Sequence, residues 1–330
     1  MNIIKRISVV SIILTIVLLV TMVLGISVGS SDQNLLHMVK ALIHPEQDPV
    51  LSASVLKLRF PRVLLAVIAG AVLSLGGVVF QSILRNPLAE PYILGISGGA
   101  AIGAILGIIM GLARFPGVGF TAFAGSILSL VLILYLSTGQ TIFQKDRLLL
   151  SGVMVNAFCS AVIMFLVSIT RDARLHNIIF WLMGDFSTIN TLQASLLLVM
   201  VIPCFIIIFM LSHTLNLLSM GKETAKSSGV RTRLIILVQL VTTSFMVSLV
   251  VGYCGLLGFV GLVVPHLMRI KLGPDHRVLV PACILGGGAY MVLCDILART
   301  LPEQGEMPTG VVTALIGAPL FIYFLKRSNR

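Results

Sequence analysis

Residues 63–84 read VLLAVIAGAVLSLGGVVFQSIL and contain no charged side chain. An α-helix needs about 20 mostly apolar residues to cross the hydrocarbon core of a bilayer, which is about 30 Å thick. Within that core, a helix satisfies the hydrogen bonds of its own backbone, which an irregular segment exposed to lipid cannot do. The stretch therefore predicts a transmembrane helix.

Eight further runs have the same apolar character. They cover residues 9–28, 93–113, 117–137, 148–170, 193–213, 234–254, 278–298 and 309–325. A tenth run, 255–268, is short and contains Pro265, which is typical of a broken or re-entrant segment. We expect an all-α membrane protein in which residues 1–330 form one transmembrane domain, a polytopic bundle of about ten helices.

The composition excludes several classes of protein. Hydrophobic residues make up 57% of the 330 residues and charged residues only 11%, whereas a soluble domain is roughly 25% charged. Ten crossings of about 20 residues leave little chain for anything outside the bilayer. A soluble enzyme, a nucleic-acid binder and a large extramembrane domain are excluded.

The basic residues predict an orientation. Lys5 and Arg6 precede the first run and Lys326, Arg327 and Arg330 follow the last, which favours cytoplasmic termini and an even number of crossings. With that topology, 15 of the 23 basic residues and 4 of the 12 acidic residues lie on the inner side, so the net charge of +11 gathers there. Orientation in an inner cell membrane explains the basic character, and nucleic acid is not needed as a partner.

The apolar runs contain few ionisable side chains that could couple transport to an ion gradient. Asp295 and Arg299 lie one helical turn apart and are expected to pair, while the other polar side chains of the runs are mainly amides and hydroxyls. Ion-coupled carriers place carboxylates or histidines at membrane depth. The sequence around Gly221-Lys222-Glu223 does not complete a phosphate-binding loop. We expect no catalytic residue, metal site or cofactor in this chain, and energy supplied by a partner.

Two patterns stay open between a structural and a functional role. Gly95, Gly99, Gly103, Gly107 and Gly111 recur every fourth residue, which fits static close packing of helices or a moving helix interface. The segment 171–192 contains Phe180, Trp181 and Phe186, which are typical of an aromatic belt at the membrane surface, with substrate contact as the alternative.

Short motifs along most of the chain resemble a known family. They are LRFPR (58–62), RNPLAEP (85–91), LGISGGA (94–100), GFVGLVVPH (258–266), GPDHR (273–277), DILAR (295–299) and PTGVVTALIGAP (308–319). In this order they resemble the FecCD family, the permease subunits of type II ABC importers for iron-siderophores, haem and cobalamin. The resemblance implies a second copy of the permease, two cytoplasmic ATP-binding subunits that hold ATP and Mg²⁺, and an extracytoplasmic solute-binding protein.

The resemblance also implies roles for individual residues. Arg59, Arg62 and Arg299 match arginines that receive acidic side chains of the solute-binding protein, and a guanidinium suits carboxylates in a planar, paired geometry. Anchoring at the membrane surface is the alternative for Arg59 and Arg62, and pairing with Asp295 is the alternative for Arg299.

Two further segments match parts of the family that work at the inner face. Within a cytoplasmic coupling segment at 214–232, the residues that match the contact with the ATPase are Gly221, Lys222, Glu223, Thr224, Ala225, Lys226, Ser227, Ser228 and Gly229. Ser228 departs from the leucine that is frequent there in the family. Asn86, Pro87 and Leu88 match a cytoplasmic gate.

The expected function is therefore uptake of an iron(III)-siderophore complex, with haem or a corrinoid as alternatives for the same machinery. An ion-coupled secondary transporter and a membrane scaffold that transports nothing are the rivals from other classes. The sequence does not determine which chelate is carried.

Overall fold

The computed structural model describes residues 3–28, 48–137, 145–170, 172–302 and 305–328. Over these residues the chain is helical and contains no strand. The α-helices are α1 (Ile3–Ser27), α3 (Pro49–Ser54), α4 (Phe60–Leu84), α5 (Ile96–Ile109), α6 (Gly119–Ser137), α7 (Lys145–Ile169), α8 (Asp172–Leu182), α9 (Thr191–Met210), α10 (Ser212–Met220), α11 (Lys222–Ser227), α12 (Thr232–Cys254), α13 (Val260–Leu272), α14 (His276–Thr300) and α15 (Thr309–Ser328). Two single turns of π-helix, η1 (Val55–Arg59) and η3 (Arg114–Val118), and one 3₁₀ turn, η2 (Pro91–Leu94), connect them.

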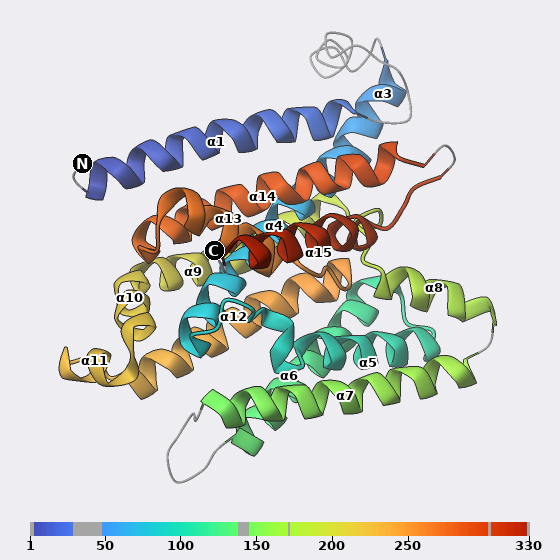
Figure 1. Ribbon diagram of the computed structural model, residues 1–330. Coiled ribbons are helices and arrows are strands. Elements are labelled where there is room, and N and C mark those ends of the chain that lie inside the picture. Colours follow the sequence, from blue (N-terminus) through green and yellow to red (C-terminus); the bar gives the residue numbers. More distant parts are fainter. Residues whose placement is uncertain (1–2, 29–47, 138–144, 171, 303–304, 329–330) are drawn as a thin grey trace.

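The long helices run side by side along one direction (Figure 1). Among the described residues, seven helical segments are long and apolar enough to cross a membrane, and α5 and α15 are shorter apolar helices. This confirms the prediction of an all-α, multi-pass membrane protein. The number of about ten crossings and the cytoplasmic position of the termini stay predictions.

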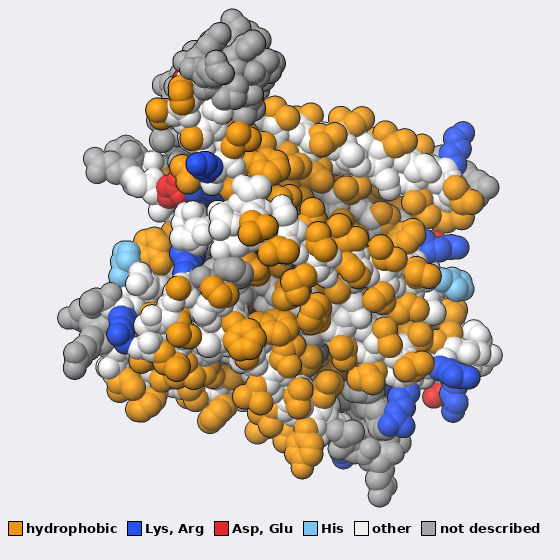
Figure 2. Space-filling model, turned by 180° about the vertical axis from the view of Figure 1, so that it is seen from behind, with side chains coloured by type: hydrophobic (Ala, Val, Ile, Leu, Met, Phe, Trp, Pro, Cys, Tyr) orange, Lys and Arg blue, Asp and Glu red, His pale blue; other side chains and the backbone are white. Residues whose placement is uncertain are grey.

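The outer surface has the composition of a membrane protein. Hydrophobic side chains cover the middle of the face in Figure 2, and charged side chains gather toward its two ends. Several large side chains that point outward belong to α1 and α7, such as Ile12 and Phe158, which are 60% and 65% exposed. In water such a surface would be costly, because each exposed apolar side chain forgoes about 1.5–3 kcal/mol of burial.

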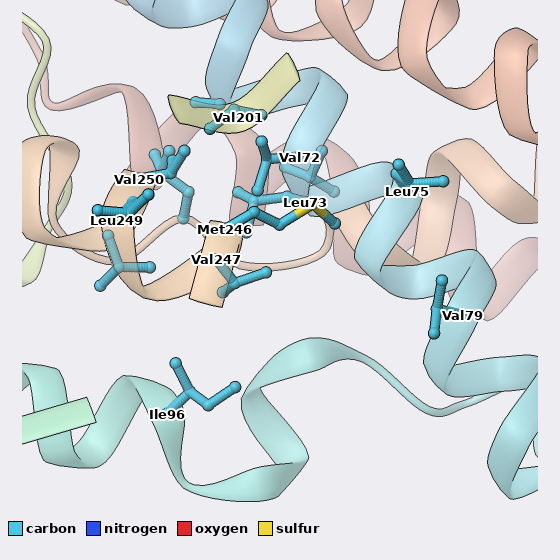
Figure 3. Close-up of a cluster of buried hydrophobic side chains, with 14 of the residues drawn as sticks. Val72, Leu73, Leu75, Val79, Ile96, Val201, Met246, Val247, Leu249 and Val250 are labelled. Atoms are coloured by element: carbon cyan, nitrogen blue, oxygen red, sulfur yellow. The ribbon is translucent and has the colours of Figure 1, made fainter. Parts of the chain in front are cut away.

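Helix α4, which the sequence 63–84 predicted, lies at the centre of the bundle and is almost entirely buried. It packs on α14, α12, α13 and α9. Figure 3 shows part of this core, where Val72 and Leu73 of α4 lie near Met246 and Val247 of α12. A helix that is apolar on all sides is expected in such a position.

The structure corrects the extent of three predicted runs. The run 93–113 is divided at Gly95, whose φ of 65° ends η2, so that α5 is only a 14-residue helix. The run 193–213 ends earlier, at Met210, and continues as α10 in a new direction. The run 255–268 becomes α13, which begins only at Val260 because Gly255 and Phe259 have positive φ. Hydropathy does not register these breaks because the residues that make them are themselves apolar.

The structure does not support the aromatic-belt interpretation of Trp181 and Phe186. Both side chains are buried in the core, 3% and 1% exposed. The chain after α8 folds back onto the end of α12, where the Asp185 amide donates to the Cys254 carbonyl over 2.9 Å. The sequence does not show this return, because it depends on a contact between segments about 70 residues apart.

Two members of the predicted glycine series, Gly99 and Gly103, lie in α5 and serve close packing. A Cβ atom on Gly99 would lie 2.3 Å from the carbonyl oxygen of Gly125, and one on Gly103 would lie 2.0 Å from that of Thr121. Helices α5 and α6 therefore approach backbone to backbone, as small residues at a four-residue spacing allow. Whether this interface also moves stays a hypothesis.

Candidate functional site

The three arginines that the sequence assigns to docking meet at one end of the bundle. Arg59, Arg62 and Arg299 line a single cavity of about 240 Å³, together with Ser54, Leu58, Ser187, Gly305 and Glu306. Arg59 ends the π-turn before α4, Arg62 lies in the first turn of α4, and Arg299 lies in the last turn of α14. Because α4 and α14 pack against each other along their length, the start of one meets the end of the other.

A buried carboxylate holds two of these arginines. Asp295 is fully buried and bonds Nε of Arg62 over 3.0 Å and Nε of Arg299 over 3.1 Å. Glu306 adds an ion pair to Arg62, and Arg299 also donates to the carbonyl oxygens of Gly25 and Val28. The side chains of Arg62 and Arg299 are only 9% and 6% exposed. The expected pairing of Asp295 with Arg299 is confirmed, whereas the Arg62 pair was missed because its partners lie 233 residues apart.

Arg59 has a different environment. Its guanidinium donates to the carbonyl oxygens of Ile26 and Ser27 at the end of α1, both over 3.1 Å, and the residue is partly exposed. These bonds fix the side chain at the rim of the cavity. The docking role of all three arginines stays a prediction.

The other end of the bundle carries the coupling and gate candidates. Helices α10 and α11 lie at the opposite end of the molecule from α8 (Figure 1). In α11 the side chain of Ala225 is buried, while Glu223, Thr224, Lys226 and Ser227 are exposed, followed by exposed Ser228 and Gly229. The structure therefore places a short helix with an open polar surface at the position that the sequence assigns to the ATPase contact.

The gate candidates follow α4 directly. Arg85 caps that helix in the left-handed conformation, with φ of 49°, and turns the chain into residues 86–88. The Asn86 amide donates to the Gln81 carbonyl over 3.2 Å, and the Asn86 side chain accepts from the Leu88 amide over 3.0 Å. A Cβ atom on Gly221 would lie 3.7 Å from a guanidinium nitrogen of Arg85, so the coupling candidates begin beside the residue that precedes the gate segment. Burial and this nearby charge lower the pKa of Lys222.

One acidic residue near the gate was not recognised as unusual in the sequence. Glu90 is partly buried and accepts a hydrogen bond from the backbone amide of Phe259, the residue in left-handed conformation before α13. Burial raises the pKa of Glu90 to about 7, although the bond from Phe259 opposes the shift. The carboxyl thus contacts the backbone of the turn between α12 and α13.

The part of the chain that the structure describes offers no candidate metal site. No three His, Cys, Asp or Glu side chains gather there in a way that could hold a metal ion. The five cysteines are buried and unpaired.

Comparison with known proteins decides the family. The model of the FecCD transport family matches residues 17–327. The chain belongs to this family. It is 37% identical over 276 residues to the vitamin B12 import system permease protein BtuC of Salmonella typhi, which covers 83% of this chain and 84% of that protein. BtuC of Citrobacter koseri is 36% identical and covers 83% of each chain.

Solved structures share the fold of this chain. A metal-chelate type ABC transporter in an inward-facing conformation superposes with a TM-score of 0.84 at 35% identity, and covers 96% of this chain and 98% of that one. PsaBC from Streptococcus pneumoniae in complex with Fab, at 15% identity and a TM-score of 0.52, shares the fold. The protein is a membrane-spanning permease of the ABC-importer type, and subunits of this family are not themselves enzymes.

Proposed function

We propose that this FecCD protein is the permease subunit of a binding-protein-dependent importer for a metal chelate. Two copies would form the pathway, two ATP-binding subunits would supply the energy with ATP and Mg²⁺, and a solute-binding protein would deliver the substrate. The observation that supports this most strongly is the placement of two polar sites at opposite ends of one apolar bundle. The arginine cavity lies at one end and the exposed helix α11 at the other.

The substrate class is a chelate of a transition metal. The BtuC relatives are named for vitamin B12, which favours a corrinoid, and the structural neighbour is named for metal chelates in general. An iron(III)-siderophore and haem belong to the same chemical class. At 37% identity the scaffold is shared while the few side chains that choose a ligand can differ.

Transport in reconstituted vesicles tests the proposal. The permease is assembled with its ATPase and binding protein, and uptake of radiolabelled cyanocobalamin, iron(III)-ferrichrome and haem is measured in turn. We expect uptake of one of them that requires ATP on the ATPase side and persists when a protonophore collapses the proton gradient. Uptake that survives an inactive ATPase but stops with the gradient would favour an ion-coupled carrier. Undiminished uptake without this chain would favour a scaffold.

The docking role of Arg59 leads to a separate prediction. Arg59→Glu is expected to weaken binding of the solute-binding protein to the assembled permease by about tenfold or more, because it places a negative charge where an acidic side chain would arrive. Lys57→Glu makes the same charge change on an exposed residue of the same π-turn, outside the cavity. Surface plasmon resonance on permease in nanodiscs compares the two. Equal losses of affinity in both variants would mean that the general charge of this end of the protein, and not Arg59 itself, determines binding.

A further inference from the structure

A chain of polar side chains, of which Ser82 and His276 are buried and Asn216 is partly buried, connects the α10–α11 end to the last turn of α4. His276, the first residue of α14, lies at its centre and is 3% exposed. Its Nε2 lies 2.5 Å from the hydroxyl oxygen of Ser82 in α4, and its Nδ1 lies 2.7 Å from Oδ1 of Asn216 in α10. Three helices that are remote in sequence therefore meet through one imidazole ring.

The hydrogen-bond roles in this chain follow from the donors and acceptors present. The Asn216 amide nitrogen donates to Oδ1 of Asp275 over 2.9 Å, since an ionised carboxylate can only accept. The Arg277 guanidinium bonded to Asp275 holds the pKa of that carboxyl well below its usual range and keeps it ionised. Oδ1 of Asn216 consequently faces the His276 backbone amide, at 2.9 Å, and the His276 Nδ1–H. Nε2 then faces the Ser82 hydroxyl oxygen, whose single proton is shared between this nitrogen and the Val78 carbonyl oxygen 2.6 Å away.

This orientation makes the connection rigid. Each ring nitrogen has one partner, Asn216 is held by three hydrogen bonds, and Ser82 and His276 are each 3% exposed. Breaking such a chain leaves a buried donor or acceptor unpaired, which costs about 1–3 kcal/mol. When α10 is displaced, α4 is therefore expected to move with it, because breaking the hydrogen bonds between the two helices is costly.

Each end of this series of hydrogen bonds lies next to a segment with a predicted role in transport. On one side, α10 continues at Gly221 into α11, the exposed helix assigned to the ATPase contact. On the other side, Ser82 lies two residues before the end of α4, whose last turn is bonded to Asn86 of the gate segment. The space beside them is open: a cavity of about 240 Å³ is lined by Ser82, Arg85, Asn86, Pro87, Ser219 and His276, among others.

We propose that the Asn216–His276–Ser82 chain is the connection through which movement of α10 and α11 reaches the gate segment 86–88. Asn216, His276 and Ser82 are positioning residues in this scheme, because they act through α4. The inference rests on the proposed function, since it assigns a coupling route within an ATP-driven importer. It predicts that the two ends can be uncoupled without stopping the ATPase end.

Distance measurements by pulsed electron paramagnetic resonance test this in the complete importer. Spin labels are placed at Lys226→Cys in the coupling segment or at Leu88→Cys in the gate segment, and the distance between the two copies is compared with and without trapped ATP. The five native cysteines are buried, so the label reacts at the introduced site. In the otherwise unchanged protein we expect both distances to change by several ångströms on trapping ATP.

With Asn216→Leu added, we expect the change at residue 226 to persist and the change at residue 88 to fall by about half or more. Ser82→Ala, which removes only one hydroxyl, is expected to act in the same direction. Two matched controls should leave both changes intact. His213→Ala alters an exposed residue of α10, and Gln81→Met removes buried bonds to α13 from the residue next to Ser82 without touching α10.

The outcomes separate the two proposals. If neither distance responds to ATP in the importer without added substitutions, the proposed function fails. If both respond there and the residue-88 change is undiminished in Asn216→Leu and Ser82→Ala, the coupling route is wrong. Loss of assembly in both variants, seen by size-exclusion chromatography, would also overturn it, because the chain would then serve the fold and not transmission.

Discussion

Replacing Asp295 by alanine is expected to destabilise the protein by about 3–5 kcal/mol, because it leaves two buried guanidinium groups without their shared counter-charge. Asp295 is fully buried and also accepts the hydroxyl proton of Thr309 over 3.2 Å. Arg62 would retain Glu306, and Arg299 would retain the carbonyl oxygens of Gly25, Val28 and residue 295. These remaining partners do not neutralise both guanidinium charges, whose side chains are only 9% and 6% exposed.

Thermal unfolding of the purified protein in detergent measures this effect, and the cavity provides its own control. Glu306 bonds the same Arg62, but its side chain is 50% exposed. Glu306→Ala is therefore expected to cost less than about 1 kcal/mol, as for other exposed ion pairs. If Asp295→Ala and Glu306→Ala lowered the midpoint equally, the arginines would not depend on the buried carboxylate, and the description of this cavity would be wrong.

Gly77→Ala is expected to prevent stable folding although it adds a single methyl group. A Cβ atom at Gly77 would lie 1.9 Å from the carbonyl oxygen of Gly261 and 2.8 Å from its Cα atom. The atoms that it meets belong to the backbone of α13 and cannot rotate away, so the two helices would have to separate. Separation opens the core around α4, and we expect a loss of more than about 3 kcal/mol.

Gly258→Ala is the matched control for this substitution. It lies three residues before Gly261, and a Cβ atom there would meet nothing within 4 Å. We expect a change within about 0.5 kcal/mol and an unaltered size-exclusion profile. The yield of monodisperse protein and the unfolding midpoint compare the two variants. Folding of Gly77→Ala at normal yield would show that α4 and α13 do not approach as closely as the structure has them.

Much of the architecture could be predicted from local information. The apolar blocks predicted helices α1, α4, α6, α7, α9, α12, α14 and α15 because the thickness of the bilayer sets the length of a crossing. Asp295 and Arg299 were expected to pair since they are four residues apart on one helix. The sequence did not predict the helix breaks at Gly95, Leu211 and Phe259. Apolar residues form these breaks, so only the backbone geometry shows where they lie.

The functional residues show the same difference between what local sequence predicts and what long-range contacts decide. The sequence motifs alone pointed to the FecCD family and to the segments at 59–62, 86–88 and 221–229, and the comparisons confirmed the family. The carboxylates that hold Arg62, the burial of Trp181 and the meeting of Ser82, His276 and Asn216 came only from the structure. Such contacts join residues up to 244 positions apart.

The sequence by itself therefore determined that this protein spans a membrane and pointed to its family, and it predicted which segments face its partners. Those properties depend on composition and on short motifs, each readable within a few turns of helix. Only the tertiary structure decided which buried polar groups satisfy one another. That choice is made by helix packing, in which glycines such as Gly77 and Gly261 set how closely two backbones approach and so which side chains can meet.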